Sequence, residues 1–166
     1  LGAEAGPWWR DDSATFRGRA MRTLRTRFPR GKIEELQAFQ GGRGIEYVHE
    51  AFSEIIEPAK PDLIVIGIGV NDAHAEQEGR PAVPVERFEP LFDKLIERSK
   101  ALGADVVIHT SMETNPFDSN GDAQRWPLYR EAMLRAAERH GIGVADTWTV
   151  WQNQRLCGIP PHSQLH

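Results

Sequence analysis

The sequence predicts an α/β protein built on a parallel β-sheet with helices on both faces. Two observations support this class. Segments with the 3.6-residue apolar period of helices alternate along the chain with short apolar segments typical of strands. The segment from Leu63 to Ile66 is apolar at every position, which is typical of a strand buried on both faces of a parallel sheet.

Each expected element follows from its local pattern. Apolar residues at helical spacing predict helices over residues 16–28, 45–56, 85–102 and about 129–137. Short apolar segments bounded by turn residues predict strands over residues 33–39, 63–66, 104–108 and 142–145. Polar loops are expected over residues 71–84 and 110–127, and a Trp-rich tail is expected after residue 146.

This order of elements bears on the two ends of the chain. The pattern opens with a helix, whereas a doubly wound domain opens with a strand that takes a central place in the sheet. The first strand is therefore expected to be missing. Residues 1–166 are expected to form a single domain that is truncated at both ends, since Leu1 is not an initiator Met and His166 ends a polar stretch that contains prolines.

Composition excludes several classes of protein. The 20 Lys and Arg residues against 24 Asp and Glu give a net charge of −4, so there is no net basic field to hold a nucleic acid. No apolar run approaches the roughly 20 residues that span a bilayer. Cys157 is the single cysteine, so no intrachain disulfide can form. Localisation and oligomeric state are not determined by these features.

Candidate functional residues lie in the loops beyond the carboxyl ends of the strands, where open α/β sheets bind their ligands. Asn71 follows the strand at 63–66, and its amide can donate an N–H to a developing negative charge. Gly44 precedes a helix and can present a backbone N–H with no side chain beside it. The alternatives are an ordinary turn pair at Asn71-Asp72 and a simple turn glycine at Gly44.

Other patterns favour ordinary structural roles. Gly67-Ile68-Gly69 is similar to a dinucleotide-binding loop, but Asp72 stands where the third glycine belongs and would repel pyrophosphate. His49, His74, His109 and His140 are scattered with no i, i+4 pairing among them, so no metal site is expected. Trp126, Trp148 and Trp151 either stack on sugar rings or pack in the core and its rim.

The glycine at position 44 and the block Gly69-Val70-Asn71-Asp72 resemble the SGNH, or GDSL-type, hydrolases and esterases. The preceding strand, residues 61–67, and the first helix, residues 16–28, are also similar to that family, so the resemblance spans roughly residues 16–146. It implies a three-layer α/β/α flavodoxin-like sandwich and ester hydrolysis through an acyl-serine. It also implies an oxyanion hole formed by Gly44, Asn71 and the N–H of the nucleophile.

Two blocks of that family are not found in the sequence. No Gly-Asp-Ser tripeptide occurs; Ser13 comes nearest, preceded by Asp12, but it can equally cap a helix. Neither His162 nor His166 has an Asp three residues before it, and Asp146 has no His three residues after it. Ser13 and His166 are therefore the candidates for nucleophile and base within this chain, and otherwise both blocks are expected to lie beyond its ends.

The sequence thus predicts a serine esterase or acylhydrolase that cleaves small acyl esters, in particular acetyl esters, of carbohydrate or lipid. No cofactor and no metal are expected, and the expected partner is a small ester substrate such as an acylated carbohydrate. The chain as it stands is expected to be inactive. Two alternatives remain: a non-catalytic binding module on the same fold, and, less favoured, a Rossmann-like nucleotide binder.

Overall fold

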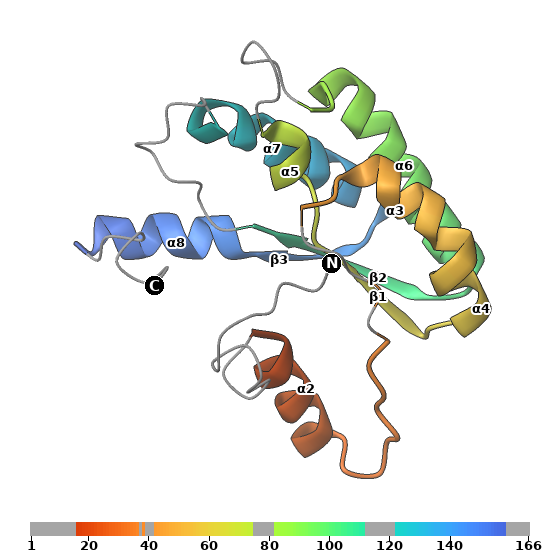
Figure 1. Ribbon diagram of the computed structural model, residues 1–166. Coiled ribbons are helices and arrows are strands. Elements are labelled where there is room, and N and C mark those ends of the chain that lie inside the picture. The colour runs from red at the N-terminus through yellow and green to blue at the C-terminus, as the bar shows by residue number, and fades with distance from the viewer. Residues whose placement is uncertain (1–15, 37, 39–41, 75–81, 112–121, 159–166) are drawn as a thin grey trace. The chain divides into compact units, whose positions relative to one another are not determined.

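The computed structural model describes residues 16–36, 38, 42–74, 82–111 and 122–158 (Figure 1). The chain divides into two compact units, Leu1–Gly41 and Gly42–His166. In the described ranges, no helix combines the length and the apolar character needed to cross a membrane.

The first unit contains helix α2 (Phe16–Arg27), which confirms the expected first helix. Two arginine side chains of the helix bind the segment that follows it. Arg17 forms an ion pair with Glu35 at 2.6 Å, and Arg25 donates to the backbone oxygen of Ile33 at 3.3 Å. The strand expected over residues 33–39 is wrong, because its described residues, 33–36 and 38, form no strand. They are held by arginine side chains, and a strand needs the backbone ladder of a neighbouring strand.

The second unit contains the parallel sheet. Its strands are β1 (Leu63–Ile66), β2 (Asp105–Thr110) and β3 (Gly143–Asp146), in the order β1-β2-β3. Each of them was expected from the sequence, and both pairings are parallel, which confirms the α/β class with a parallel sheet. Burial on both faces of β1 is not found, because Leu63 and Val65 are 46% and 57% exposed whereas Ile66 is buried.

A helical layer lies against the face of the sheet that carries Ile66 and Ile108 (Figure 1). Its members are α3 (Ile45–Ala51), the π-helical turn η1 (Phe52–Ile56), α4 (Glu57–Ala59), α5 (Val70–Ala73), α6 (Val85–Ala101) and α7 (Asp122–His140). The core between helices and sheet is built on fully buried Phe88, Phe92 and Trp126. Because this core consists of large apolar side chains, burial of its surface is the main source of stability in the unit.

The helix expected over residues 45–56 is present but widens into the π-helical turn η1. In the wider turn the backbone oxygen of His49 needs another donor, and Arg98 supplies it. Its guanidinium donates to the backbone oxygen of His49 at 3.0 Å and lies over the ring of Phe52, 4.2 Å from the centroid. A side chain that replaces a backbone donor allows the wider turn.

Three segments differ from the sequence expectation. Helix α7 begins at Asp122, so residues 122–127 are helical and not part of a loop. Buried Trp126 on the first turns of this helix supplies the packing that offsets the lost hydrogen bond at Pro127. The expected loop after residue 70 opens with the short helix α5, and the expected tail is helix α8 (Thr147–Leu156). Asp146 starts α8, because its side chain accepts the N–H of Thr149.

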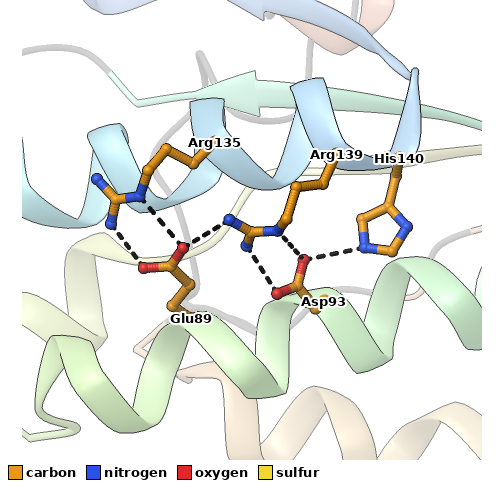
Figure 2. Close-up of polar contacts among 5 residues, drawn as sticks. All are labelled: Glu89, Asp93, Arg135, Arg139 and His140. Carbon is orange, nitrogen blue, oxygen red and sulfur yellow. Dashed lines mark hydrogen bonds and ion pairs between the residues drawn. The ribbon is translucent and has the colours of Figure 1, made fainter.

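Helices α6 and α7 are also joined by a polar cluster (Figure 2). Glu89 and Asp93 of α6 face Arg135, Arg139 and His140 of α7. Arg139 bridges both carboxylates, at 2.9 Å from Glu89 and 2.7 Å from Asp93. The hydrogen bond from Arg135 lowers the pKa of Glu89, so this carboxyl is charged at neutral pH.

Candidate active site

The turn after β1 places the candidate residues at the carboxyl end of the sheet. Gly69 has φ +110°, in the left-handed region, and a Cβ there would lie 2.9 Å from the ring of Trp126. Both conditions require glycine. The chain then enters α5, which carries Asn71 and Asp72.

Asn71 is exposed, and its amide holds the loop that precedes α3. Its Nδ2 donates to the backbone oxygen of Arg43 at 2.9 Å. A primary amide carries two N–H groups, so one remains for a ligand. Because Gly44 follows Arg43 directly, this bond places Asn71 close to Gly44.

Asp72 is buried beside the same loop. Its Oδ1 accepts the N–H of Ile45 at 2.8 Å, and its side chain is fully inaccessible to solvent. Its Oδ2 has no hydrogen-bond partner in the part of the chain that the structure describes. Burial raises the pKa of this carboxyl, although nearby backbone N–H groups, that of Ile45 foremost, oppose the rise. Sequence reasoning missed this role, although Asp72 stands in the block that singled out Asn71.

A second carboxylate lies at the end of β3. Asp146 forms an ion pair with Arg130 and accepts hydrogen bonds from Thr149 at 2.6 Å and Thr110 at 2.9 Å. Burial alone would raise the pKa of this carboxyl, but the bonds from Arg130 and the two threonines outweigh it and hold the pKa well below 3.8. Arg130 also lies over the ring of Trp148, 4.5 Å from the centroid. Through these contacts, Asp146 joins α7 to the start of α8.

The other candidate residues are the two proposed for nucleophile and base and the tryptophans. Ser13 and His166 lie outside the described residues. Trp126 is fully buried, so it packs in the core and cannot stack on a sugar ring, whereas Trp151 is half-buried on α8. In the described ranges, His, Cys, Asp and Glu side chains form no group of three able to hold a metal ion.

Comparison with known proteins decides the family. The model of the GDSL-like Lipase/Acylhydrolase family matches residues 4–162, nearly the whole chain and both compact units. The chain belongs to the GDSL-like lipase/acylhydrolase family. This agrees with the resemblance carried by Gly44 and by the block at residues 69–72.

A relative found by comparison of sequences is distant. The chain is 25% identical to the uncharacterized lipoprotein YqeF of Bacillus subtilis (strain 168), over an alignment of 137 residues that covers 72% of this chain and 56% of that protein. The chain thus spans a little over half the length of this curated relative.

Solved structures show the same fold. LAE5, an alpha/beta hydrolase enzyme from the metagenome of Lake Arreo, Spain, matches with a TM-score of 0.73 and 22% identity, covering 87% of this chain and 68% of its own. The acetyl xylan esterase AlAXEase matches with a TM-score of 0.70 and 18% identity, covering 85% and 72%. Axe2, an acetylxylan esterase from Geobacillus stearothermophilus, matches with a TM-score of 0.60 and 21% identity, covering 74% and 57%.

Proposed function

We propose that the protein is a serine esterase that removes small acyl groups, above all acetyl, from a carbohydrate through an acyl-serine intermediate. Membership of the GDSL-like lipase/acylhydrolase family supports ester hydrolysis as the reaction class. Two of the proteins whose fold it shares are called acetyl xylan esterases, which supports acetylated carbohydrate as the substrate class.

The observation that carries the proposal is the arrangement of Gly44 and Asn71. One N–H of the Asn71 amide donates to the backbone oxygen of Arg43, and the second N–H is left for a ligand. Among described residues, the hydrogen bonds at this junction come from the Asn71 amide and from the N–H groups of Ile45 and Val48, and in this proposal the N–H of Gly44 donates to the substrate. Two donors beside each other at the end of a strand suit an oxygen that becomes negative.

In the proposed reaction, a serine hydroxyl attacks the ester carbonyl, and a histidine accepts its proton and passes it to the departing alcohol. Water then hydrolyses the acyl-serine to the free acid. Gly44 and Asn71 donate to the carbonyl oxygen as it gains charge in both steps. Asn71 suits this role because it donates without changing its protonation state.

The test is Asn71→Ala in the full-length protein that carries this chain, assayed with p-nitrophenyl acetate and with acetylated xylo-oligosaccharide. We expect kcat to fall by roughly 10² to 10³, about 2.7 to 4 kcal/mol, with a much smaller change in KM, because an oxyanion donor acts mainly in the transition state. Asn153→Ala, an exposed asparagine on α8, is the matched control and should leave kcat unchanged.

The result separates catalysis from a purely structural role. If Asn71 only holds the loop through Arg43, its loss lowers the melting temperature and leaves kcat of the folded variant near that of the wild type. Saturable binding of the acetylated oligosaccharide by a wild-type protein that does not hydrolyse either ester would replace the enzyme with a binding module. That alternative is kept because the sequence contains no Gly-Asp-Ser tripeptide.

A further inference from the structure

Asn71 and Asp72 hold the two peptide groups that flank Gly44. The Asn71 amide bonds the oxygen of Arg43, the residue before Gly44, at 2.9 Å. The Asp72 carboxylate bonds the N–H of Ile45, the residue after it, at 2.8 Å. Two consecutive side chains therefore fix the backbone on both sides of one glycine.

Asp72 itself is firmly placed by its backbone. Its carbonyl oxygen accepts the N–H of Val83 at 3.1 Å, and the oxygen of Val83 accepts the hydroxyl of Tyr129 on α7. Both Asp72 and Tyr129 are buried. The carboxylate is thus attached to the rigid core, so it can hold the exposed loop at a defined position.

The same carboxylate explains the glycine at position 44. A Cβ there would lie 2.4 Å from Oδ1 of Asp72 and 2.9 Å from its Cγ, far inside contact distance. The backbone at Gly44 has φ −104°, which any residue can adopt, so conformation does not demand glycine. The space that a side chain would need is filled by Asp72.

This solution is costly compared with an ordinary helix start. A Ser or Asn at position 44 could cap α3 with its own side chain near the surface. No side chain caps α3 in this way, and the N–H of Ile45, its first residue, donates to a distant carboxylate whose second oxygen is buried without a described partner. The arrangement is understandable if position 44 must stay free of any side chain while its backbone stays fixed.

We propose that Asp72 is a positioning residue of the oxyanion site: through Ile45 and by contact with Gly44, it aims the Gly44 N–H at the substrate carbonyl beside Asn71. This inference rests on the proposed function. Asp72 touches no reacting atom; it acts on the geometry of a donor that does.

The first experiment compares Asp72→Ala, Asp72→Asn and Asn71→Ala in the full-length protein with p-nitrophenyl acetate. Asp72→Ala removes the acceptor for Ile45, so we expect kcat of the folded variant to fall by roughly 10- to 100-fold with little change in KM, because a misaimed donor loses transition-state stabilisation. Asp72→Asn keeps an acceptor oxygen and should stay within about fivefold of the wild type. Asp62→Ala, an exposed carboxylate before β1, is the control.

The second experiment tests the contact between Gly44 and Asp72 with a double-mutant cycle. Gly44→Ala alone forces the new methyl group against the carboxylate and should lower kcat strongly. In the Asp72→Ala background there is room for that methyl group, so Gly44→Ala should cost at least several-fold less. Gly143→Ala, whose Cβ would meet only an ordinary contact at 3.5 Å, controls for a general effect of adding a methyl group.

The outcomes distinguish the two proposals. If Asn71→Ala lowers kcat but folded Asp72→Ala keeps wild-type kcat, the positioning role is wrong and the oxyanion site stands. If Gly44→Ala costs the same with and without the Asp72 carboxylate, or if Asp72→Asn is as poor as Asp72→Ala, positioning through this contact is also wrong. If Asn71→Ala keeps normal kcat or the wild type hydrolyses no ester, the proposed function falls and the inference falls with it.

Discussion

Asp72 lies beyond the end of β1 and Asp146 is the last residue of β3, yet their carboxylates are held in opposite ways. Asp72 is fully buried, bonds one backbone N–H and has no cationic partner in the described ranges. Asp146 is half-buried, forms an ion pair with Arg130 and accepts hydrogen bonds from two threonine hydroxyls. Burial raises the pKa of Asp72, whereas the donors around Asp146 overcome burial and lower its pKa.

The difference teaches what each carboxylate does. An ion pair with satisfied oxygens stabilises the fold, and Asp146 joins β3, α7 and α8 in this way. A buried carboxylate with an unpaired oxygen costs free energy, so its presence at Asp72 has to be explained by the geometry it imposes. Asp146 is thus a structural carboxylate, whereas we propose that the Asp72 carboxylate positions the site.

The largest effect on stability is expected from Arg130→Ala, which leaves Asp146 without its charge partner. We expect the free energy of unfolding to fall by roughly 2 to 3 kcal/mol, near the lower end for a broken buried pair because Asp146 keeps some solvent contact. The pKa of Asp146, followed by NMR, should rise from its depressed value. Chemical denaturation measures the loss of stability.

The control for this change is Arg135→Ala on the same helix. Arg135 also pairs with a carboxylate, but its side chain is 51% exposed. We expect a loss below about 1 kcal/mol. Equal losses for the two arginine variants would show that the surroundings of Asp146 add nothing to a surface ion pair, and the contrast with Asp72 would disappear.

An intermediate effect is expected in the pH dependence of stability of Asp146→Asn and Asp72→Asn. The depressed pKa of Asp146 contributes stability that is present above its ordinary pKa of 3.8 and is lost as pH falls through the folded-state value. The raised pKa of Asp72 contributes stability that is present below 3.8 and is lost as pH rises through the folded-state value.

The two variants should therefore change in opposite directions relative to the wild type. As pH rises from about 3 to 7, Asp146→Asn becomes less stable than the wild type, whereas Asp72→Asn gains stability relative to it. Denaturation at several pH values, with Asp62→Asn as the exposed control, measures both trends. Parallel trends for the two variants would contradict the assignment of opposite environments.

The smallest effect is expected at the cluster in Figure 2. Replacing Glu89 by Gln together with Asp93 by Asn removes both carboxylates that join α6 to α7. We expect a loss of about 1 kcal/mol or less, further reduced in high salt. The arginine partners of these carboxylates, Arg135 and Arg139, are 51% and 43% exposed, and ion pairs with exposed side chains are weak and screened. Melting curves at low and high salt measure it. If the free energy of unfolding fell by more than in Arg130→Ala, burial of the ion pairs would not explain how much each one stabilises the fold.

Much of the fold could be predicted from the sequence. Three strands and the helices expected at residues 16–28, 45–56 and 85–102 carry strong apolar patterns, and the structure confirms them. The strand expected after Lys32 failed because apolar alternation alone cannot supply a neighbouring strand. Helix α8 was missed because its start depends on Asp146 as a cap, which the composition of a Trp-rich segment does not reveal.

The candidate site was predicted only in part. Gly44 and Asn71 were singled out because residue type and position beside an expected helix or strand are local properties. Their proximity is a tertiary contact, made by the hydrogen bond from Asn71 to the backbone oxygen of Arg43. The sequence by itself determined the α/β class, the family resemblance and these two residues. The tertiary structure decided the rest: that Asp72 bonds Ile45 and fills the space beside Gly44, and that Asp146 pairs with Arg130. These contacts join residues 16 to 28 positions apart, and burial and hydrogen-bond geometry at such separations arise only when the chain has packed.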